Sequence, residues 1–401
     1  MAVPAYRYVI VGAGTAGGSA VEGLRELDPE GSILLLGEEQ HRPYERPPLS
    51  KKLWTPEGQV EEAFLRSEGY YAEQGVEMLL GVRAVGLDAA ARQVTFSDGR
   101  EFTYEKLLLA TGGVPRRLTL PGGETKGLCY YRYLDDFLAL RPLATAGKRA
   151  VVIGGSFIGS EMAAALNLQG VDVTMLFPEE HLVQRVFPAG LGRALTQHYE
   201  GLGVRILSRE KPAAIERAED GFTVVAQGGE RLPADIVVAG VGIGLEVALA
   251  EQAGLTLGDG VEVDEYLQTS APGIYAAGDL ARFPDATLGE RRRVEHWDNA
   301  VNQGRQAGRN LAGAGERYDY LPYFYSDLFE FGYEAVGDIN PSLEVVADWK
   351  QENDTGVLYF LREGKLRGAM MCNVWDQVPA ARELIQSGKT VTAEDLRGAI
   401  G

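Results

Sequence analysis

Glycines recur at a fixed spacing in two stretches of the chain, each behind a run of β-branched residues and ahead of small residues. They are Gly12, Gly14 and Gly17 in the first stretch, and Gly154 and Gly159 in the second, where Ser156 replaces the middle glycine. The first glycine of such a set permits a tight strand-to-helix turn, the second leaves room for a phosphate, and the third lets helix and strand pack closely. The helix then offers free N–H groups to a pyrophosphate. One set is weak evidence, because glycines also make ordinary turns, but two predict two bound dinucleotides and electron transfer between them.

Acidic residues follow each set at the distance that such a site requires. Glu38 and Glu39 come after residues 33–36, and Glu179 and Glu180 come after residues 173–176. An acid at the end of the second strand accepts hydrogen bonds from ribose hydroxyls. Because serine is small, we expect Ser156 to shift the dinucleotide backbone slightly without loss of binding.

The composition describes an ordinary globular protein of two to three domains. The chain has 401 residues, of which 45% are hydrophobic and 24% charged, and no apolar run reaches the roughly 18 residues of a membrane span. The first strand begins almost at once, so we expect no signal or transit peptide and a cytoplasmic location. Cys129 and Cys372 form no CxxC pair and no metal-ligand spacing, which argues against a redox-active dithiol, a protein-bound iron–sulfur cluster or any metal site.

The net charge of −18 limits the partners. It disfavours nucleic acids and anionic membranes. An acidic protein partner would need a local basic patch, for which the candidates are Arg291 to Arg293 with Arg305 and Arg309, or Arg116 with Arg117. Taken alone, each cluster is more simply a solvated charged face.

The surrounding elements repeat as well. Residues 92–104 alternate around Asp98-Gly99, and residues 220–232 carry similar turn signals, so each predicts a hairpin. Each hairpin leads into a short buried strand, which ends in Ala110-Thr111-Gly112 in the first repeat and near Gly242 in the second. A third such strand precedes Gly278-Asp279, and residues 300–311 are helix-like. From about residue 322 the chain becomes aromatic and strand-like, and it ends in a helical pattern at residues 379–386.

These elements predict an α/β fold. We expect two Rossmann-like doubly wound dinucleotide-binding domains with β-meander crossovers, plus a small α+β C-terminal domain. The first binding domain would comprise residues 1–114 and 243–318, the second residues 115–242, and the C-terminal domain residues 319–401.

The motifs taken jointly resemble the two-dinucleotide FAD/NAD(P)H flavoprotein reductases, in the branch that contains ferredoxin reductases and apoptosis-inducing factor. The resemblance rests on both glycine sets and on residues 46–51 (RPPLSK), 110–112 (ATG), 276–279 (AAGD) and 292–296 (RRVEH). Residues 177–179 (FPE) and 325–328 (YSDL) look particularly like apoptosis-inducing factor. The resemblance covers essentially the whole chain and implies FAD in the first site and a nicotinamide dinucleotide in the second.

The resemblance also implies which side chains serve the two sites. For FAD they are Glu38, Glu39, Arg46, Lys51, Ala110, Thr111, Gly112, Gly278, Asp279, Glu295, His296, Trp297 and Tyr325. For the nicotinamide dinucleotide they are Gly154, Ser156, Phe157, Ile158, Gly159, Glu179, Arg185 and Gly242. Asp279 would accept a hydrogen bond from a ribityl hydroxyl. Phe177 stands where many NADH enzymes of this type carry an acid, and here the acid is Glu179. Since Glu179 and Glu180 would repel a 2′-phosphate, NADH is favoured over NADPH, with Arg185 as a candidate exception.

Lys51 and Glu161 are the expected tuning pair at the flavin. Glu161 lies in an apolar helix, where an isolated charge is costly, and an ion pair would relieve that cost and place a positive charge near flavin N5. Phe157 either covers the flavin until nicotinamide displaces it or packs in the core. Hydride transfer needs no acid–base step, so His296, beside Glu295, is assigned to positioning. Trp297 and Tyr325 either flank the isoalloxazine or belong to the core.

These residues predict an FAD-dependent NADH oxidoreductase that passes electrons to a one-electron acceptor. The resemblance implies a 2Fe–2S ferredoxin, whereas the acidic net charge favours a small quinone. The alternative is an NADH-sensing interaction protein like apoptosis-inducing factor, with a long-lived charge-transfer complex. The oligomeric state is open, and a homodimer is one alternative.

Overall fold

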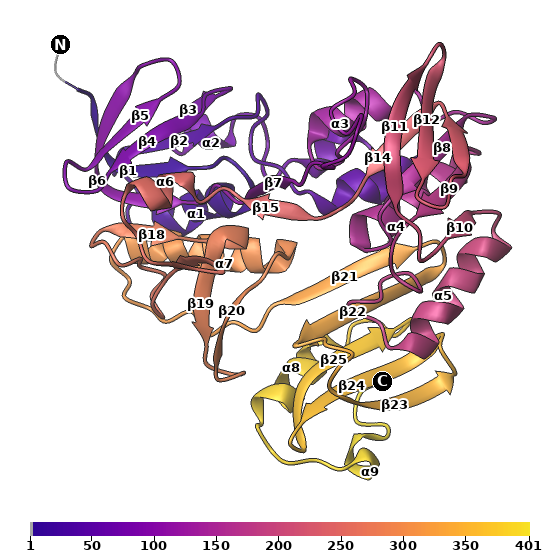
Figure 1. Ribbon diagram of the computed structural model, residues 1–401. Coiled ribbons are helices and arrows are strands. Elements are labelled where there is room, and N and C mark those ends of the chain that lie inside the picture. Colours follow the sequence, from indigo (N-terminus) through magenta and orange to yellow (C-terminus); the bar gives the residue numbers. More distant parts are fainter. Residues whose placement is uncertain (1–2) are drawn as a thin grey trace. The chain divides into compact units, whose positions relative to one another are not determined.

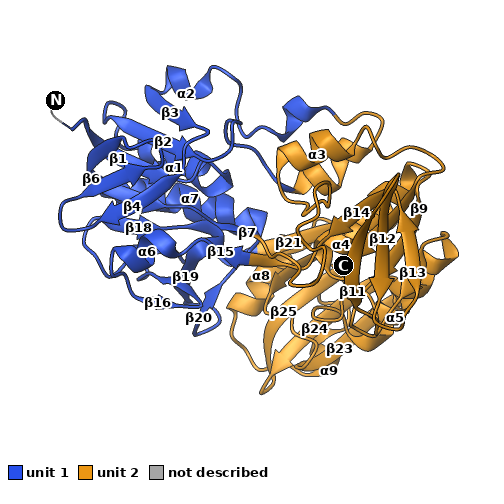
Figure 2. Cartoon of the chain, turned by 45° about the horizontal axis from the view of Figure 1, so that its top comes forward, with its two compact units in different colours: residues 1–46, 59–114, 244–322 blue, residues 47–58, 115–243, 323–401 orange. Residues whose placement is uncertain are grey.

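The chain divides into two units, each assembled from segments that are far apart in the sequence. The computed structural model describes residues 3–401 and places the unit boundaries near residues 46, 58, 114, 243 and 322 (Figure 2). The first unit holds Met1–Arg46, Gln59–Val114 and Gly244–Pro322, and the second holds Pro47–Gly58, Pro115–Ile243 and Tyr323–Gly401.

A seven-stranded sheet forms the centre of the first unit (Figure 1). Its strands are β1 (Ala5–Val11), β2 (Ile33–Gly37), β3 (Val76–Leu80), β4 (Ala84–Asp88), β5 (Gln93–Phe96), β6 (Glu101–Leu109) and β18 (Ile274–Ala276). The order is β3-β2-β1-β6-β5-β4, with β18 also beside β6. Strands β1, β2, β3, β6 and β18 pair in parallel, whereas β4, β5 and β6 form an antiparallel meander. The long strand β6 therefore belongs to both the parallel core and the meander.

Two helices of the first unit, α1 (Thr15–Arg25) and α7 (Trp297–Leu311), pack closely through glycines. An added Cβ would come within 1.9 Å of the Arg305 carbonyl oxygen at Gly23, within 2.2 Å of the Ala16 oxygen at Gly304, and within 2.1 Å of the Ala20 oxygen at Gly308. Helix α7 begins three residues before the predicted residue 300, because Asp298 provides a favourable negative charge in its first turn.

The remaining elements of the first unit are short. They are η3 (Val60–Ala63), α2 (Tyr70–Glu73), α6 (Ala248–Gln252), η4 (Gly278–Leu280), β16 (Leu257–Gly258), β17 (Gly260–Glu262), β19 (Ala281–Asp285) and β20 (Glu290–Arg293). The last four strands form one sheet in the order β16-β17-β19-β20. Strands β7 (Gly113–Pro115) and β15 (Ile243–Leu245) pair as a two-stranded sheet at the points where the chain passes from one unit to the other.

The second unit repeats the parallel arrangement in its central segment. Strands β8 (Arg149–Ile153), β9 (Asp172–Leu176), β10 (Arg205–Leu207) and β14 (Ile236–Ala239) lie in the parallel order β10-β9-β8-β14. The meander of this segment consists of β11 (Pro212–Ala218), β12 (Gly221–Ala226) and β13 (Arg231–Ala234). Its helices are α3 (Leu134–Leu140), α4 (Phe157–Leu168) and α5 (Ala189–Gly201), and the short segment Pro47–Gly58 adds η1 (Pro47–Ser50) and η2 (Lys52–Trp54).

The C-terminal segment of the second unit is an antiparallel sheet with helices. The strands are β21 (Tyr323–Leu328), β22 (Phe331–Gly337), β23 (Glu344–Gln351), β24 (Thr355–Arg362) and β25 (Lys365–Cys372), in the order β21-β22-β25-β24-β23. Helix α8 (Val378–Gln386) packs on β22 and β25 through its buried face, and α9 (Ala393–Leu396) follows.

The predicted α/β class, the two doubly wound repeats and the α+β C-terminal segment are confirmed. The first predicted hairpin is β5–β6, with Gly99 at φ +84°, and the second is β12–β13, with Gly229 at φ +89°. The division into three domains stays a prediction. Within residues 3–401, no helix is both long enough and apolar enough to cross a membrane.

Candidate functional site

The first glycine turn, between β1 and α1, is fixed by close backbone contacts. Gly12 has φ +118°, and its N–H donates a 2.8 Å hydrogen bond to the Leu36 carbonyl. A Cβ on Gly12 would lie 2.2 Å from the Ala110 carbonyl oxygen, and one on Gly17 would lie 1.9 Å from the Gly12 oxygen. The backbone fold therefore requires glycine at positions 12 and 17, whether or not a ligand is bound.

At Gly14, the N-cap of α1, no contact within the protein explains why the residue is glycine. A Cβ there would meet no protein atom within 4 Å. The helix start has no side-chain cap and no acid in its first turn, so its N–H groups and positive end remain available to an anion. The open space over Gly14 fits a dinucleotide pyrophosphate.

The second turn, between β8 and α4, has the same geometry. Gly154 also has φ +118°, and a Cβ on Gly159 would lie 2.0 Å from its carbonyl oxygen. Ser156 is the N-cap, with φ −100° and ψ −161° against −83° and −166° at Gly14, and its side chain makes no capping hydrogen bond. The serine thus preserves the backbone of the turn and leaves the helix N–H groups available. Gly242, after β14, has φ +91° and open space above it.

The acids after β2 make different contacts. Glu38 is exposed and lies 3.4 Å from Arg83. Glu39 accepts hydrogen bonds from Tyr44 at 2.5 Å and from Arg46 at 3.0 Å. Tyr44 and Arg46 are thereby both brought to the first acidic pair. Neither contact was predicted from the sequence, and the role of Arg46 at FAD stays a prediction.

The acids after β9 lie beyond a buried aromatic. The Gly12 N–H bonds the Leu36 carbonyl and the Gly154 N–H bonds the Leu176 carbonyl, so Phe177 corresponds to Gly37. Phe177 is fully buried. Glu180 is held by Arg209 at 2.9 Å, whereas Glu179 is 3.8 Å from the highly exposed Arg185. Glu179 is therefore the less constrained acid of the pair.

Residues around the carboxyl ends of β6 and β18 complete the first site. Thr111 donates a 2.8 Å hydrogen bond to the Glu246 carbonyl, and Gly112 has φ +62°. Gly278 donates its N–H to Oε1 of Gln303 at 2.8 Å, immediately before Asp279. Gln303 is fully buried, and its Nε2 has no hydrogen-bond partner within residues 3–401. An orphaned buried donor at this position fits a ligand acceptor. Sequence reasoning missed Gln303, because only its place on α7 brings it to β18.

Glu295, His296 and Trp297 lie at the start of α7. Glu295 pairs with Arg293, His296 is the N-cap, and Trp297 is the first helical residue. Burial, assisted by the positive charge of Arg292, lowers the pKa of His296 to about 3. A neutral imidazole at ordinary pH supports the positioning role and gives no acid–base catalyst.

The expected pair of Lys51 and Glu161 is present in the second unit. Lys51 Nζ lies 2.7 Å from Glu161 Oε1, and Glu161 is only 4% exposed. Two hydroxyls also donate to this carboxylate: Ser50 to Oε2 at 2.5 Å and Ser326 to Oε1 at 2.6 Å. Both serines lie inside motifs that the sequence revealed, but their contact with Glu161 was not predicted.

The aromatic candidates of the second unit are not deep core residues. Phe157 is half-buried, with its ring edge-on to Phe324 at 5.8 Å, and Ile158 beside it is exposed. The Tyr325 ring centre lies 5.5 Å from Lys51 Nζ. This arrangement brings Tyr325 to the Lys51–Glu161 pair. Phe157 is not part of the deep core, and its role at the flavin stays a prediction.

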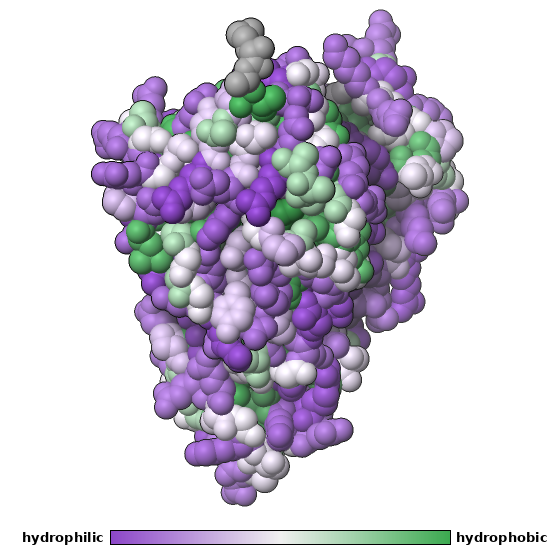
Figure 3. All heavy atoms as spheres, turned by 90° about the vertical axis from the view of Figure 1, so that its left-hand side faces the viewer, coloured by the Kyte–Doolittle hydropathy of each residue, from purple (hydrophilic) through white to green (hydrophobic). Residues whose placement is uncertain are grey.

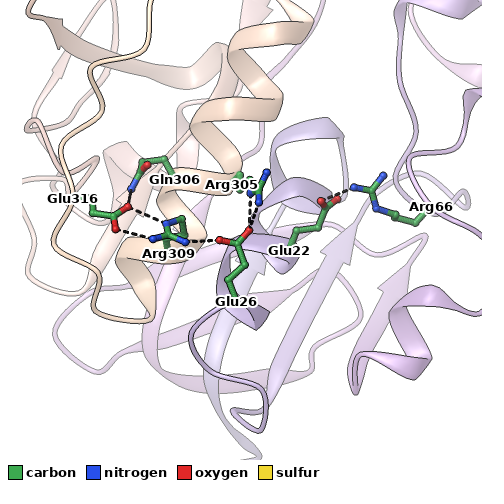
Figure 4. A network of polar contacts seen from close by, with 7 residues as sticks. All are labelled: Glu22, Glu26, Arg66, Arg305, Gln306, Arg309 and Glu316. Atoms are coloured by element: carbon green, nitrogen blue, oxygen red, sulfur yellow. Dashed lines mark hydrogen bonds and ion pairs between the residues drawn. The ribbon is translucent and has the colours of Figure 1, made fainter.

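The candidate basic patches of the first unit are largely neutralised within that unit. Arg309 bonds both Glu26 and Glu316, and Arg305 bonds Glu26 (Figure 4). Arg291, Arg292 and Arg293 likewise pair with carboxylates. By contrast, Arg116 and Arg117 are exposed; Arg116 donates to the Ile243 carbonyl, and Arg117 stacks on Tyr130 at 4.3 Å. The face in Figure 3 is mostly hydrophilic, with separate small hydrophobic patches.

Burial raises the pKa of both thiols, those of Cys129 and Cys372, far above the ordinary value, and neither forms a disulfide. Neither thiol is thus suited to act as a thiolate nucleophile.

Two strand–turn–helix sites of matching geometry define a protein with two dinucleotide-binding folds. Residues 6–304 match the model of the pyridine nucleotide-disulphide oxidoreductases, and the chain belongs to this family. It is 33% identical over 390 residues to the ferredoxin–NAD(+) reductase component of the anthranilate 1,2-dioxygenase system of Burkholderia cepacia, covering 97% of this chain and 96% of that one. It is 30% identical over 427 residues to apoptosis-inducing factor 1, mitochondrial, of Dictyostelium discoideum, covering 98% and 80%.

Among solved structures, the chain is similar to the covalent putidaredoxin reductase–putidaredoxin complex. The TM-score is 0.91 at 32% identity, and the match covers 97% of this chain and 95% of that one.

Proposed function

We propose that this protein is an FAD-dependent NADH oxidoreductase that takes a hydride from NADH and passes electrons singly to a ferredoxin-type 2Fe–2S protein. The observation that carries the proposal is the repeated turn: Gly12 and Gly154 share φ +118°, and each precedes an uncapped helix start. Two dinucleotide sites in one chain suit hydride transfer between cofactors. The relatives named as ferredoxin reductases support the acceptor class.

The cofactors supply the redox chemistry, with the nicotinamide as hydride donor and the isoalloxazine as acceptor. The turn at Gly14 and its partner at Ser156 bind the two pyrophosphates. Glu39 and Glu179 accept hydrogen bonds from ribose hydroxyls, and Asp279 does so from a ribityl hydroxyl. Lys51 contributes a positive charge that favours reduced flavin, and the buried Glu161 holds its ammonium group. His296 stays neutral and helps to position the residues around it at the start of α7.

NADH is proposed as the preferred donor. Phe177 fills the position directly after β9, and the first acid beyond it is Glu179, which lies 3.8 Å from Arg185. A carboxylate here favours a ribose 2′-hydroxyl and repels a 2′-phosphate. The two free thiols suit a reducing compartment, and we place the protein in the cytoplasm.

A ferredoxin is proposed over a quinone because of the relatives' acceptors, although the net charge of −18 slows encounter with an acidic partner. The test is NADH-driven reduction of a 2Fe–2S ferredoxin and of a soluble quinone, each over a range of salt concentrations. We expect ferredoxin reduction with the higher kcat/KM, and a rate that rises with salt. Efficient quinone reduction with no ferredoxin reduction would contradict the acceptor assignment.

A second candidate is an NADH-sensing interaction protein. The match to apoptosis-inducing factor and residues 177–179 (FPE) favour it. In that case turnover would be incidental, and NADH would change the association state of the protein. Size-exclusion chromatography with and without NADH, under anaerobic conditions, distinguishes the two candidates.

A further inference from the structure

The carboxylate of Glu161 is held from two distant parts of the chain. Lys51 and Ser50 come from the segment around η1, whereas Ser326 comes from β21 in the C-terminal sheet. Ser50 is 5% exposed and Ser326 is 1% exposed, so water does not readily replace either hydroxyl. Ser326 thus links the C-terminal sheet to the tuning pair by a hydrogen bond, beside the contact of Tyr325 with Lys51.

We propose that Ser326 is a positioning residue of the flavin site: its hydroxyl shares Glu161 Oε1 with Lys51, and it thereby sets how much of the Lys51 charge acts on the flavin. This inference rests on the proposed function of the Lys51–Glu161 pair. It gives the C-terminal sheet a part in setting the reduction potential.

The physical argument concerns the distribution of donors on a buried carboxylate. A carboxylate accepts about four hydrogen bonds, and a buried one is stabilised by each donor it gains. Three donors are in place here: Ser50 on Oε2, and Ser326 and Lys51 on Oε1. Without the Ser326 hydroxyl, Lys51 is the one donor that remains on Oε1 of Glu161. The ammonium is then drawn more fully to Glu161, and less positive charge remains to favour reduced flavin.

No other side chain near Glu161 donates to its carboxylate within residues 3–401. Tyr199 donates to the Ser160 carbonyl at 3.0 Å, and Tyr131 donates to the Leu49 carbonyl. Burial and the negative charge of Glu161 raise the pKa of Asp327, and no hydrogen bond joins the two carboxyl groups within residues 3–401. The phenol of Tyr333 is fully buried, and no hydrogen bond to it occurs within residues 3–401.

The test measures the equilibrium ratio of reduced to oxidised flavin in the FAD-loaded protein, poised against a redox dye under anaerobic conditions. The variants are Ser326→Ala, Ser326→Thr, which keeps the hydroxyl, and Lys51→Met. We expect Ser326→Ala to lower the ratio about threefold, since hydrogen bonds to charged groups are the stronger ones, and Lys51→Met to lower it further. Ser326→Thr should keep the native ratio, with FAD content and melting temperature recorded for each variant.

Each outcome decides the proposal. An unchanged ratio in Ser326→Ala, together with a lower ratio in Lys51→Met, overturns the role of Ser326 and leaves that of Lys51 intact. Unchanged ratios in both overturn the proposed tuning pair and this inference with it. A ratio lowered equally in Ser326→Ala and in a folded Ser326→Thr assigns the effect to packing and also overturns the inference. If Ser326→Ala does not fold, the nearly isosteric Ser326→Cys, a weak donor, replaces it with the same expected direction.

Discussion

The ring of Phe177 lies against the backbone of Gly155 in the second nucleotide-binding turn, where an added Cβ would be 2.6 Å from the ring. In the first turn, the side chain that fills this space belongs to the turn and not to the end of the strand. There the turn residue is Ala13 and the strand-end residue is Gly37, and a Cβ on Gly37 would be 2.6 Å from that of Ala13. The two repeats have thus exchanged the larger and the smaller residue across one contact. In both repeats an acid follows two residues after the strand-end residue: Glu39 after Gly37, and Glu179 after Phe177.

We expect Gly155→Ala to destabilise the protein by about 1–3 kcal/mol, the usual cost of overpacking a buried site. The methyl group has no room beside Phe177, which is fully buried. Gly201→Ala is the matched control, because a Cβ at this helical glycine meets nothing within 4 Å. Denaturant midpoints measure both. Equal stability of Gly155→Ala and the control would show that the contact with Phe177 is not restrictive.

Gly14→Ala should weaken FAD binding about tenfold, equivalent to about 1.4 kcal/mol, with little effect on folding. No protein atom lies within 4 Å of the added Cβ, and the backbone angles of Gly14 suit alanine. Flavin fluorescence during dilution gives the affinity, and thermal unfolding of the apoprotein gives the stability. Native FAD affinity in Gly14→Ala would mean that the open space over this helix start is not the pyrophosphate site.

Lys51→Ala should slow flavin reduction by NADH without abolishing FAD binding. It should also cost about 1–3 kcal/mol in stability, less than the 3–5 kcal/mol of a fully broken buried pair, because Ser50 and Ser326 still donate to Glu161. The double variant Lys51→Met/Glu161→Gln should regain stability but not rate. Stopped-flow reduction and melting curves give both quantities. A native reduction rate in Lys51→Ala would remove Lys51 from the mechanism.

Glu179→Ser should shift donor preference towards NADPH by about tenfold in the ratio of kcat/KM values, since it removes a carboxylate that repels a 2′-phosphate. Glu180→Ser is the control, because Glu180 is already held by Arg209 at 2.9 Å. Steady-state kinetics with both donors measures the ratio. A shift in the control but not in Glu179→Ser would assign the ribose contact to the wrong acid.

His296 makes the native state sensitive to acid. Its folded pKa of about 3 lies below the ordinary value of 6.5, so between these values the unfolded state binds more protons and stability falls as pH falls. Relative to His296→Gln, which cannot titrate, the native protein should lose about 1–2 kcal/mol between pH 7.5 and pH 5. Unfolding midpoints of both proteins at the two pH values test this. A constant difference would mean that the imidazole titrates normally in the folded state.

The sequence revealed the elements whose signals are local. The glycine sets, the Asp98-Gly99 hairpin and the C-terminal strands each depend on neighbouring residues, and the structure contains them all. Lys51 and Glu161 were paired because a carboxylate in an apolar helix needs a partner and the family motif supplied one. Ser326 and Gln303 were missed because their contacts, with Glu161 and Gly278, join segments that only the tertiary fold brings together. Arg305 and Arg309 suggested a docking patch because Glu26, which neutralises both of them in the structure, lies far away in the sequence.

The measurement that tests the central claim most directly is an anaerobic titration of the FAD-loaded protein with NADH, followed by addition of an oxidised 2Fe–2S ferredoxin and visible spectroscopy. We predict that one equivalent of NADH bleaches the flavin and that two equivalents of ferredoxin restore its colour within seconds. A long-wavelength charge-transfer band that persists after ferredoxin and air are added would contradict the account and favour a sensing role.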